Sequence, residues 1–280
     1  IRQLYVERQY DLYVLSDHGM TNSLPFPWAY GQTLEEFLAE HTGQEIESGE
    51  VSGEDEGLPE ARVQFLLDEI RGLEERPHSP LSAHLLRATR ERLEARFLAE
   101  AIDGEWDLSR RGSIAVRNSG SLSHVYFDVT TRPMDLSEVA LIYPSLLGAL
   151  ISHEGIGLVA GRDGEDVVIA GRAGTLRINP TGNRLEGQNP LDGLVDPRWA
   201  AEQVARVARF PHAGDLILLG AMHGERVICF EEQVASHGGL GGPQGWPFLA
   251  SAADAGLGGR GIENSEEIYT RLVRVYGDYQ

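Results

Sequence analysis

Lysine is absent from this 280-residue chain, and all 24 of its basic side chains are arginine. The absence excludes enzymes that form a Schiff base on lysine and phosphate-binding loops that depend on a lysine. Positive charge is scarce as a whole, because 43 acidic residues give a formal net charge of −19. So acidic a chain is not expected to bind nucleic acid or an anionic membrane, since both are polyanions.

Cysteine and long apolar runs are nearly missing too. The single cysteine, Cys229, cannot form an internal disulfide, and its place in the apolar run VICF predicts a buried, unreactive thiol. No apolar run reaches the roughly 18 residues of a membrane helix, so we expect no transmembrane segment in this chain. These features favour a soluble, cytoplasmic protein. The chain begins with Ile1 and soon enters an apolar run, so we expect a longer protein whose preceding part could carry a signal or a membrane anchor.

The composition that remains is that of a globular α/β protein, with 41% hydrophobic and 24% charged residues. A continuous apolar run stopped by a polar turn is typical of a buried strand in a parallel sheet. Strands are predicted at 11–16, 113–129, 156–160, 166–170, 175–178, 215–220 and 226–230. Apolar residues at helical spacing predict helices that start near Leu34 and at 135–151, 199–208 and 266–275.

These elements predict one α/β domain over residues 1–280. An acidic, glycine-rich stretch at 43–58 precedes two amphipathic helical patterns, which predict an inserted helical hairpin at 58–105. Within helix 135–151, Asp135 and Glu138 predict a capping box and Pro144 predicts a kink. Residues 251–280 are predicted to form a C-terminal tail with a docking helix.

The first candidate site is Ser16–Met20 (SDHGM), directly after the first predicted strand. Open α/β sheets place their sites at the carboxyl ends of strands. Asp17 supplies an oxygen ligand and His18 a nitrogen ligand, a mixture that suits Zn²⁺ or Mn²⁺ better than Ca²⁺. The alternative is a turn with a capping aspartate and a surface histidine.

The second candidate is His237, which opens the glycine-rich run HGGLGG. So many glycines predict a loop whose backbone closely approaches a ligand or another segment. His237 could bind a metal there, or the loop could form a nest of N–H groups for an anion. A flexible loop with an incidental histidine is the alternative. The other histidines have no acidic partner at ligand spacing and are expected to be structural or on the surface.

The run YDLYVLSDHGM, with the later segment around His237, resembles the alkaline phosphatase superfamily, in particular its type I phosphodiesterase and nucleotide pyrophosphatase branch. The resemblance implies an alkaline phosphatase-like, mostly parallel sheet flanked by helices. It implies two divalent metal ions, Zn²⁺ first and Mn²⁺ second, with Asp17 and His18 on one and His237 on the other. The Thr or Ser nucleophile and the remaining ligands would lie upstream of residue 1.

The function implied is hydrolysis of a small phosphorylated substrate, a phosphodiester or phosphomonoester, through a covalent phospho-enzyme. The backbone near Asn118 could position that substrate, with a plain turn as the alternative reading. Two other functions stay open at this stage. One is a phosphomutase or sulfatase of the same superfamily, and the other is a non-catalytic interaction domain that has kept the fold.

Overall fold

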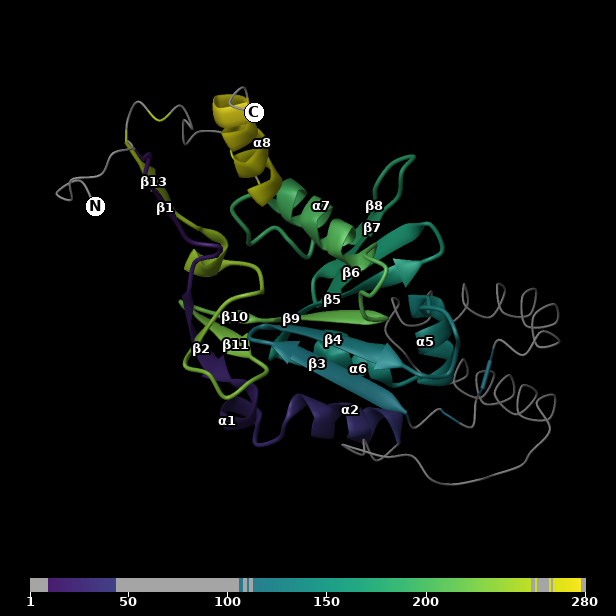
Figure 1. Cartoon of the computed structure of the whole chain (residues 1–280). Helices are drawn as coiled ribbons and strands as arrows, with labels where there is room; N and C mark the ends of the chain where they lie inside the picture. The colour runs from purple at the N-terminus through teal and green to yellow at the C-terminus, as the bar shows by residue number, and fades with distance from the viewer. Residues whose placement is uncertain are drawn as a thin grey trace.

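The computed structural model describes residues 10–43, 106–107, 110, 113–252, 255, 262 and 264–277. This part of the chain is a mixed α/β structure with three β-sheets (Figure 1). The predicted hairpin at 58–105 lies outside the described residues. Among the helices that are described, none has both the length and the apolar character needed to cross a membrane.

The largest sheet has seven strands in the order β3-β4-β9-β5-β6-β7-β8. Every neighbouring pair in it is antiparallel. Its strands are β3 (Ile114–Ser119), β4 (Leu122–Phe127), β5 (Ile156–Asp163), β6 (Asp166–Gly171), β7 (Gly174–Ile178), β8 (Arg184–Gly187) and β9 (Leu216–Gly220). The predictions of strands at 156–160, 166–170, 175–178 and 215–220 are therefore confirmed.

Helices cover both faces of this sheet. Alternate residues of β9 enter two separate apolar clusters: Leu216 and Leu218 on one face, Ile217 and Leu219 on the other. The first cluster contains α2 (Leu34–Thr42), α5 (Leu136–Ile142) and α6 (Leu146–Ser152), and the second contains α7 (Pro197–Ala208). Figure 1 shows α7 above the sheet and α2 below it.

The expectation of a mostly parallel sheet is wrong for the described residues. All the strand pairs except β2 with β11 are antiparallel there. The run at β9 is continuously apolar because helices cover both faces of the sheet, and such cover does not depend on strand direction. The apolar pattern therefore predicted the burial of these strands correctly, but the parallel strand direction inferred from it was wrong.

Two local signals, the capping box at Asp135 and the proline at position 144, act on this helical segment, and the effect of the proline is stronger than the predicted kink. The backbone N–H of Asp135 donates to Glu138 Oε2 at 2.8 Å, so the capping box starts α5. Pro144 ends the pattern rather than kinking it, because α5 stops at Ile142 and α6 starts at Leu146. The proline ring cannot donate the hydrogen bond that a continuous helix would require.

The predicted single strand at 113–129 is two strands. β3 and β4 form a hairpin in which Ser119 pairs with Leu122. Gly120 lies in the turn with φ at 62°, a left-handed conformation that favours glycine. The alternating pattern continued through the turn, so the periodicity alone did not reveal the reversal.

A second sheet has four strands in the order β10-β11-β2-β12. Its strands are β2 (Thr21–Pro25), β10 (Met222–His223), β11 (Arg226–Cys229) and β12 (Ala235–Ser236). A short helix, α1 (Phe26–Tyr30), follows β2, and a 3-10 turn, η2 (Gly242–Gly245), follows β12. Cys229 is fully buried in β11, which agrees with the sequence.

The third sheet pairs β1 (Tyr13–Leu15) with β13 (Leu249–Ser251), antiparallel and two-stranded. Val14 is 47% exposed and Leu15 50% exposed. The prediction of a buried strand at 11–16 is therefore wrong in the part of the chain that the structure describes. Burial of a strand depends on another part of the protein packing over it, and neither the length nor the apolar content of the segment says whether such a part exists.

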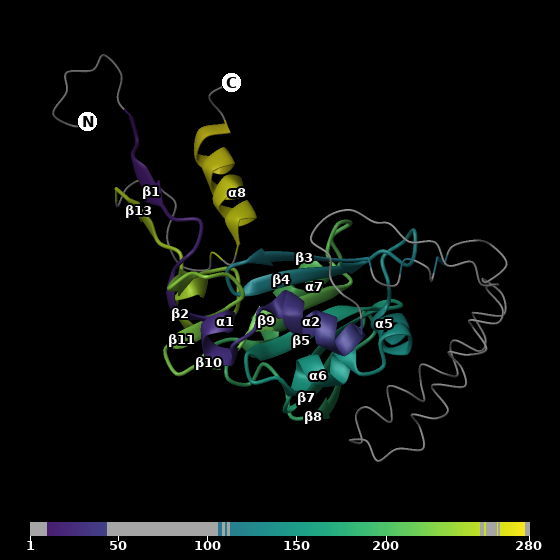
Figure 2. The ribbon, with the colours of Figure 1, turned by 90° about the horizontal axis from the view of Figure 1, so that it is seen from below.

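The last described helix, α8 (Ser265–Tyr276), agrees with the predicted helix at 266–275. It extends from the same end of the molecule as the β1–β13 ribbon in both views (Figures 1 and 2). None of its residues is buried, and Oε1 of Glu266 forms an ion pair with a guanidinium nitrogen of Arg206 in α7 at 2.5 Å. Docking of the C-terminal tail onto the core stays a prediction.

Asp215 is a buried charge that joins three elements. Its Oδ2 accepts from the N–H of Phe127 at 2.8 Å and its Oδ1 from the N–H of Met134 at 2.7 Å. Arg162 lies 3.7 Å from Oδ1, and Asp215 is only 5% exposed. Burial raises the pKa of the Asp215 carboxyl, against the opposing effect of the two N–H donors.

Candidate functional site

The structure brings His18 and His237 into contact, although they lie far apart in the chain. Strand β12 pairs antiparallel with β2, with Ser236 opposite Thr21. His237 follows β12 and His18 precedes β2, so the register places both residues at the same end of the pair. Their imidazole rings stack with centroids 3.6 Å apart and planes 13° apart.

The His18 ring has a defined tautomer. Its Nδ1 lies 2.7 Å from the carbonyl oxygen of Gly19, and a carbonyl only accepts, so Nδ1 carries the proton. Nε2 of the neutral ring then holds a lone pair, 3.5 Å from Oδ2 of Asp17. Nε2 of His18 and the Asp17 carboxylate thus present one nitrogen and one oxygen donor to a cation.

Solvent reaches these donors. The Asp17 side chain is 87% exposed and that of His18 is 34% exposed. Among the residues that the structure describes, no cluster of three or more His, Cys, Asp or Glu side chains is arranged to hold a metal ion. The donors fit a transition metal in chemical type, and further ligands would be needed to complete its coordination.

Gly19 allows the two loops of the site to approach closely. Its N–H donates to the carbonyl of Gln244 at 3.0 Å. A Cβ at this position would lie 1.9 Å from the carbonyl oxygen of Pro243 and 3.0 Å from that of Trp246. The DHG turn therefore needs a glycine at this position because of close packing.

The glycine-rich loop packs against the β3–β4 turn. The N–H of Ser121 donates to the carbonyl of His237 at 3.2 Å. Gly238 has φ at 93°, and a Cβ on Gly239 would lie 2.4 Å from Oγ of Ser121. The interpretation of close backbone approach is therefore correct, and the approaching segment is a protein turn.

Sequence reasoning missed two residues that hold this region together. Glu231 Oε2 accepts from the N–H of Gly120 at 2.5 Å, and the buried side chain of Gln244 bonds within the glycine-rich loop. Gln244 is the only long polar side chain between Gly238 and Trp246. A single amide side chain in such a glycine-rich run could have indicated a residue that fixes the loop by hydrogen bonds.

Asn118, the predicted substrate-binding residue, lies on β3 near the same turn. Its Nδ2 donates to Oε1 of Glu35 at 2.9 Å, while its Oδ1 is buried without a hydrogen-bond partner among the described residues. The amide nitrogen is thus directed to α2. A role for Asn118 in substrate binding stays a prediction.

The other described histidines are structural or on the surface, as expected. His124 Nδ1 accepts from the N–H of Gly214 at 2.9 Å, and His153 Nδ1 accepts from the N–H of Gly155 at 3.0 Å. The His153 ring also stacks on Phe26, with centroids 4.9 Å apart. Burial lowers the pKa of both imidazoles.

These two histidines predict a loss of stability in mild acid. Both pKa values lie below the ordinary value of about 6.5, so the unfolded state binds more protons once the pH falls below that value. Their contribution is complete above about pH 6.5 and is lost as the pH falls through the folded-state values. Denaturant titrations at pH 7.5 and pH 5 should show the decrease.

A double variant tests this assignment. His124→Asn with His153→Asn keeps an acceptor near each Nδ1 position and removes the titration, so the free energy of unfolding should vary less with pH. His223→Asn, at an exposed imidazole that contacts the Glu154 carbonyl, is the matched control and should change the free energy of unfolding by less than about 0.5 kcal/mol. An unchanged slope in the double variant would contradict the assignment.

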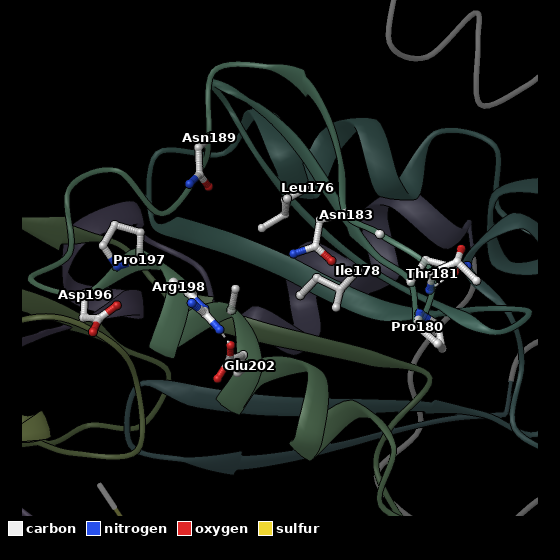
Figure 3. A pocket seen from close by; sticks show the side chains of 13 residues that line it. Leu176, Ile178, Pro180, Thr181, Asn183, Asn189, Asp196, Pro197, Arg198 and Glu202 are labelled. Atoms are coloured by element: carbon white, nitrogen blue, oxygen red, sulfur yellow. Dashed lines mark hydrogen bonds and ion pairs between the residues drawn. The ribbon is translucent and has the colours of Figure 1, made fainter. Parts of the chain in front are cut away.

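A separate concavity of about 750 Å³ lies between the β7–β8 hairpin and the start of α7 (Figure 3). Leu176, Ile178 and Ala201 contribute apolar lining. Arg198 and Glu202 pair at 3.0 Å on its α7 side. None of the predicted site residues lines it, so the concavity is independent of the His18–His237 pair.

Comparison with known proteins identifies no relative. No family model matches the chain, and no curated protein and no solved structure gives a match.

Proposed function

We propose that this chain forms part of a metal-dependent hydrolase of phosphate esters, a phosphodiesterase or phosphatase. The observation that carries the proposal is the contact between His18 and His237, whose imidazole centroids lie 3.6 Å apart. The motif resemblance implies that these two residues bind two neighbouring metal ions.

The donor set supports the same chemistry. Asp17 and His18 would hold one divalent ion and His237 the other, with Zn²⁺ favoured and Mn²⁺ second. When bound, two such ions polarise a phosphate ester and stabilise its attacking and leaving oxygens. The proposal places the nucleophile and the remaining ligands outside the described residues.

The chain's own residues have definite tasks in this proposal. The Gly19 carbonyl fixes the His18 tautomer, which leaves Nε2 as the free donor beside the Asp17 carboxylate. Gly19 permits the close contact between the DHG turn and residues 243–246, and Gly239 permits the contact between the glycine-rich loop and Ser121. The acidic surface does not prevent binding of an anionic substrate, because bound cations reverse the sign of the local field.

Metal content and affinity provide the direct test. The native protein, loaded with Zn²⁺ or Mn²⁺ and freed of excess ion, should retain metal measurable by mass spectrometry. His18→Ala and His237→Ala should each weaken binding by about 100-fold or more, since replacement of an outer partner of a ligand already costs about 10–100-fold. Metal-dependent hydrolysis of aryl phosphate monoesters and diesters by the native protein completes the test.

His212→Ala is the matched control, because the structure assigns only the backbone carbonyl of His212 a hydrogen bond, from Tyr126. It should bind metal as tightly as the wild type. Equal affinity in all variants would refute the ligand assignment. A metal-loaded native protein that cleaves neither type of ester would refute the proposed activity.

A further inference from the structure

We propose that Gln244 is a positioning residue that locks the DHG turn and the glycine-rich loop together, and so holds His18 and His237 face to face. As far as it concerns metal binding, the inference rests on the proposed function. Its structural part concerns the metal-free protein and stands separately.

The side chain of Gln244 uses its full hydrogen-bonding capacity, with three bonds inside the glycine-rich loop and one to the β3–β4 turn. Its Oε1 accepts from Ser121 Oγ at 3.1 Å and from the N–H of Gly239 at 3.2 Å. Its Nε2 donates to the carbonyls of Leu240 at 3.2 Å and Gly241 at 2.8 Å. The residue is only 3% exposed, so water cannot replace these bonds without local opening.

The backbone of Gln244 reaches the other loop. Its N–H donates to Oγ1 of Thr21 at 2.8 Å, and its carbonyl accepts from the N–H of Gly19 at 3.0 Å. His18 directly precedes Gly19, and Thr21 begins β2. One residue is therefore bonded both to the loop that carries His237 and to the turn that carries His18.

The composition of the loop explains why such an anchor is needed. Four glycines at positions 238, 239, 241 and 242 give the segment large backbone freedom in the absence of fixed contacts. Ser121 adds a second restraint, because its N–H donates to the His237 carbonyl at 3.2 Å, and its single hydroxyl proton is shared between that carbonyl at 3.3 Å and Gln244 Oε1 at 3.1 Å. Gln244 and Ser121 are also bonded to each other, so the restraint is continuous from the β3–β4 turn to the DHG turn.

The test compares Gln244→Met, which keeps the approximate size and removes every side-chain hydrogen bond, with Asp196→Ala. Asp196 accepts from the Trp199 N–H at 2.9 Å and caps α7, so its loss destabilises the fold elsewhere. Nuclear magnetic resonance of metal-free protein with labelled histidine reports the imidazole pair, and His18→Asn and His237→Asn assign the signals.

Wild-type protein and Asp196→Ala should show a cross-relaxation contact between the two rings and upfield ring-current shifts. Gln244→Met should lose both while its circular dichroism stays native. Zn²⁺ affinity should fall by about tenfold or more in Gln244→Met and stay unchanged in Asp196→Ala. A retained ring contact in Gln244→Met, or no contact in the wild type, would overturn the inference.

The two proposals fail in different ways. If wild-type protein binds no metal, the proposed function fails, while the ring contact still decides the role of Gln244. If Gln244→Met does not fold, Ser121→Ala takes its place, because it removes the hydroxyl that is shared between Gln244 Oε1 and the His237 carbonyl. A partial loss of the ring contact is expected in that variant, and an unchanged contact would count against the inference.

Discussion

Replacement of Asp215 by Ala should lower the free energy of unfolding by about 3–5 kcal/mol, the cost of removing one partner from a buried charged network. The backbone N–H groups of Phe127 and Met134 would lose their acceptor in the interior. Arg162, whose side chain is 18% exposed, would lose its nearby carboxylate. Chemical denaturation followed by circular dichroism measures the loss.

Asp215→Asn separates the charge from the hydrogen bonds. The amide oxygen can accept from one of the two N–H groups, while its NH₂ faces the other, so a loss of about 1–3 kcal/mol is expected. Burial raises the Asp215 pKa, so ionisation costs the folded state, and wild type should gain stability relative to Asp215→Asn as the pH falls through that raised value.

The matched control for Asp215→Ala is Asp192→Ala, at an exposed carboxylate, which should change the free energy of unfolding by less than about 0.5 kcal/mol. A comparable effect of Asp192→Ala and Asp215→Ala would refute the role of Asp215 as a buried acceptor that joins three elements.

Gly19→Ala should separate the two loops of the candidate site. The new Cβ would lie 1.9 Å from the Pro243 carbonyl oxygen, so the turn or the 3-10 segment must move. The constraint is spatial, because Gly19 is not among the glycines with positive φ. We expect a loss of about 1–3 kcal/mol in the free energy of unfolding, typical of overpacking. The Gly19–Gln244 hydrogen bond should break, and metal binding by His18 and His237 should weaken strongly.

Gly245→Ala is the matched control for this substitution. Gly245 lies in the same 3-10 segment, and a Cβ there would meet nothing within 4 Å among the described residues beyond its own chain neighbours. Its stability and metal affinity should stay close to those of the wild type. Amide hydrogen exchange at Gly19 should accelerate only in Gly19→Ala, and equal exchange in both variants would contradict the packing argument.

Two of the residues that the sequence singled out lie in contact, while their role as metal ligands stays a prediction. Asp17, His18 and His237 were selected by residue chemistry and motif resemblance, and the structure places the two imidazoles in contact. The strand predicted before Asp17 is present as β1, but its predicted burial was wrong. The segment before Asp17 is an exposed two-stranded ribbon, because nothing in an apolar run states which partner will cover it.

Local sequence by itself determined the capping box at Asp135, the break at Pro144, the buried apolar strands and the glycines of the two loops. Each follows from the geometry of a few neighbouring residues. Tertiary structure alone decided strand direction in the large sheet, the register that joins β2 to β12, and the role of Gln244. Those features depend on pairings between distant segments, and side-chain periodicity is the same whichever neighbour a strand acquires.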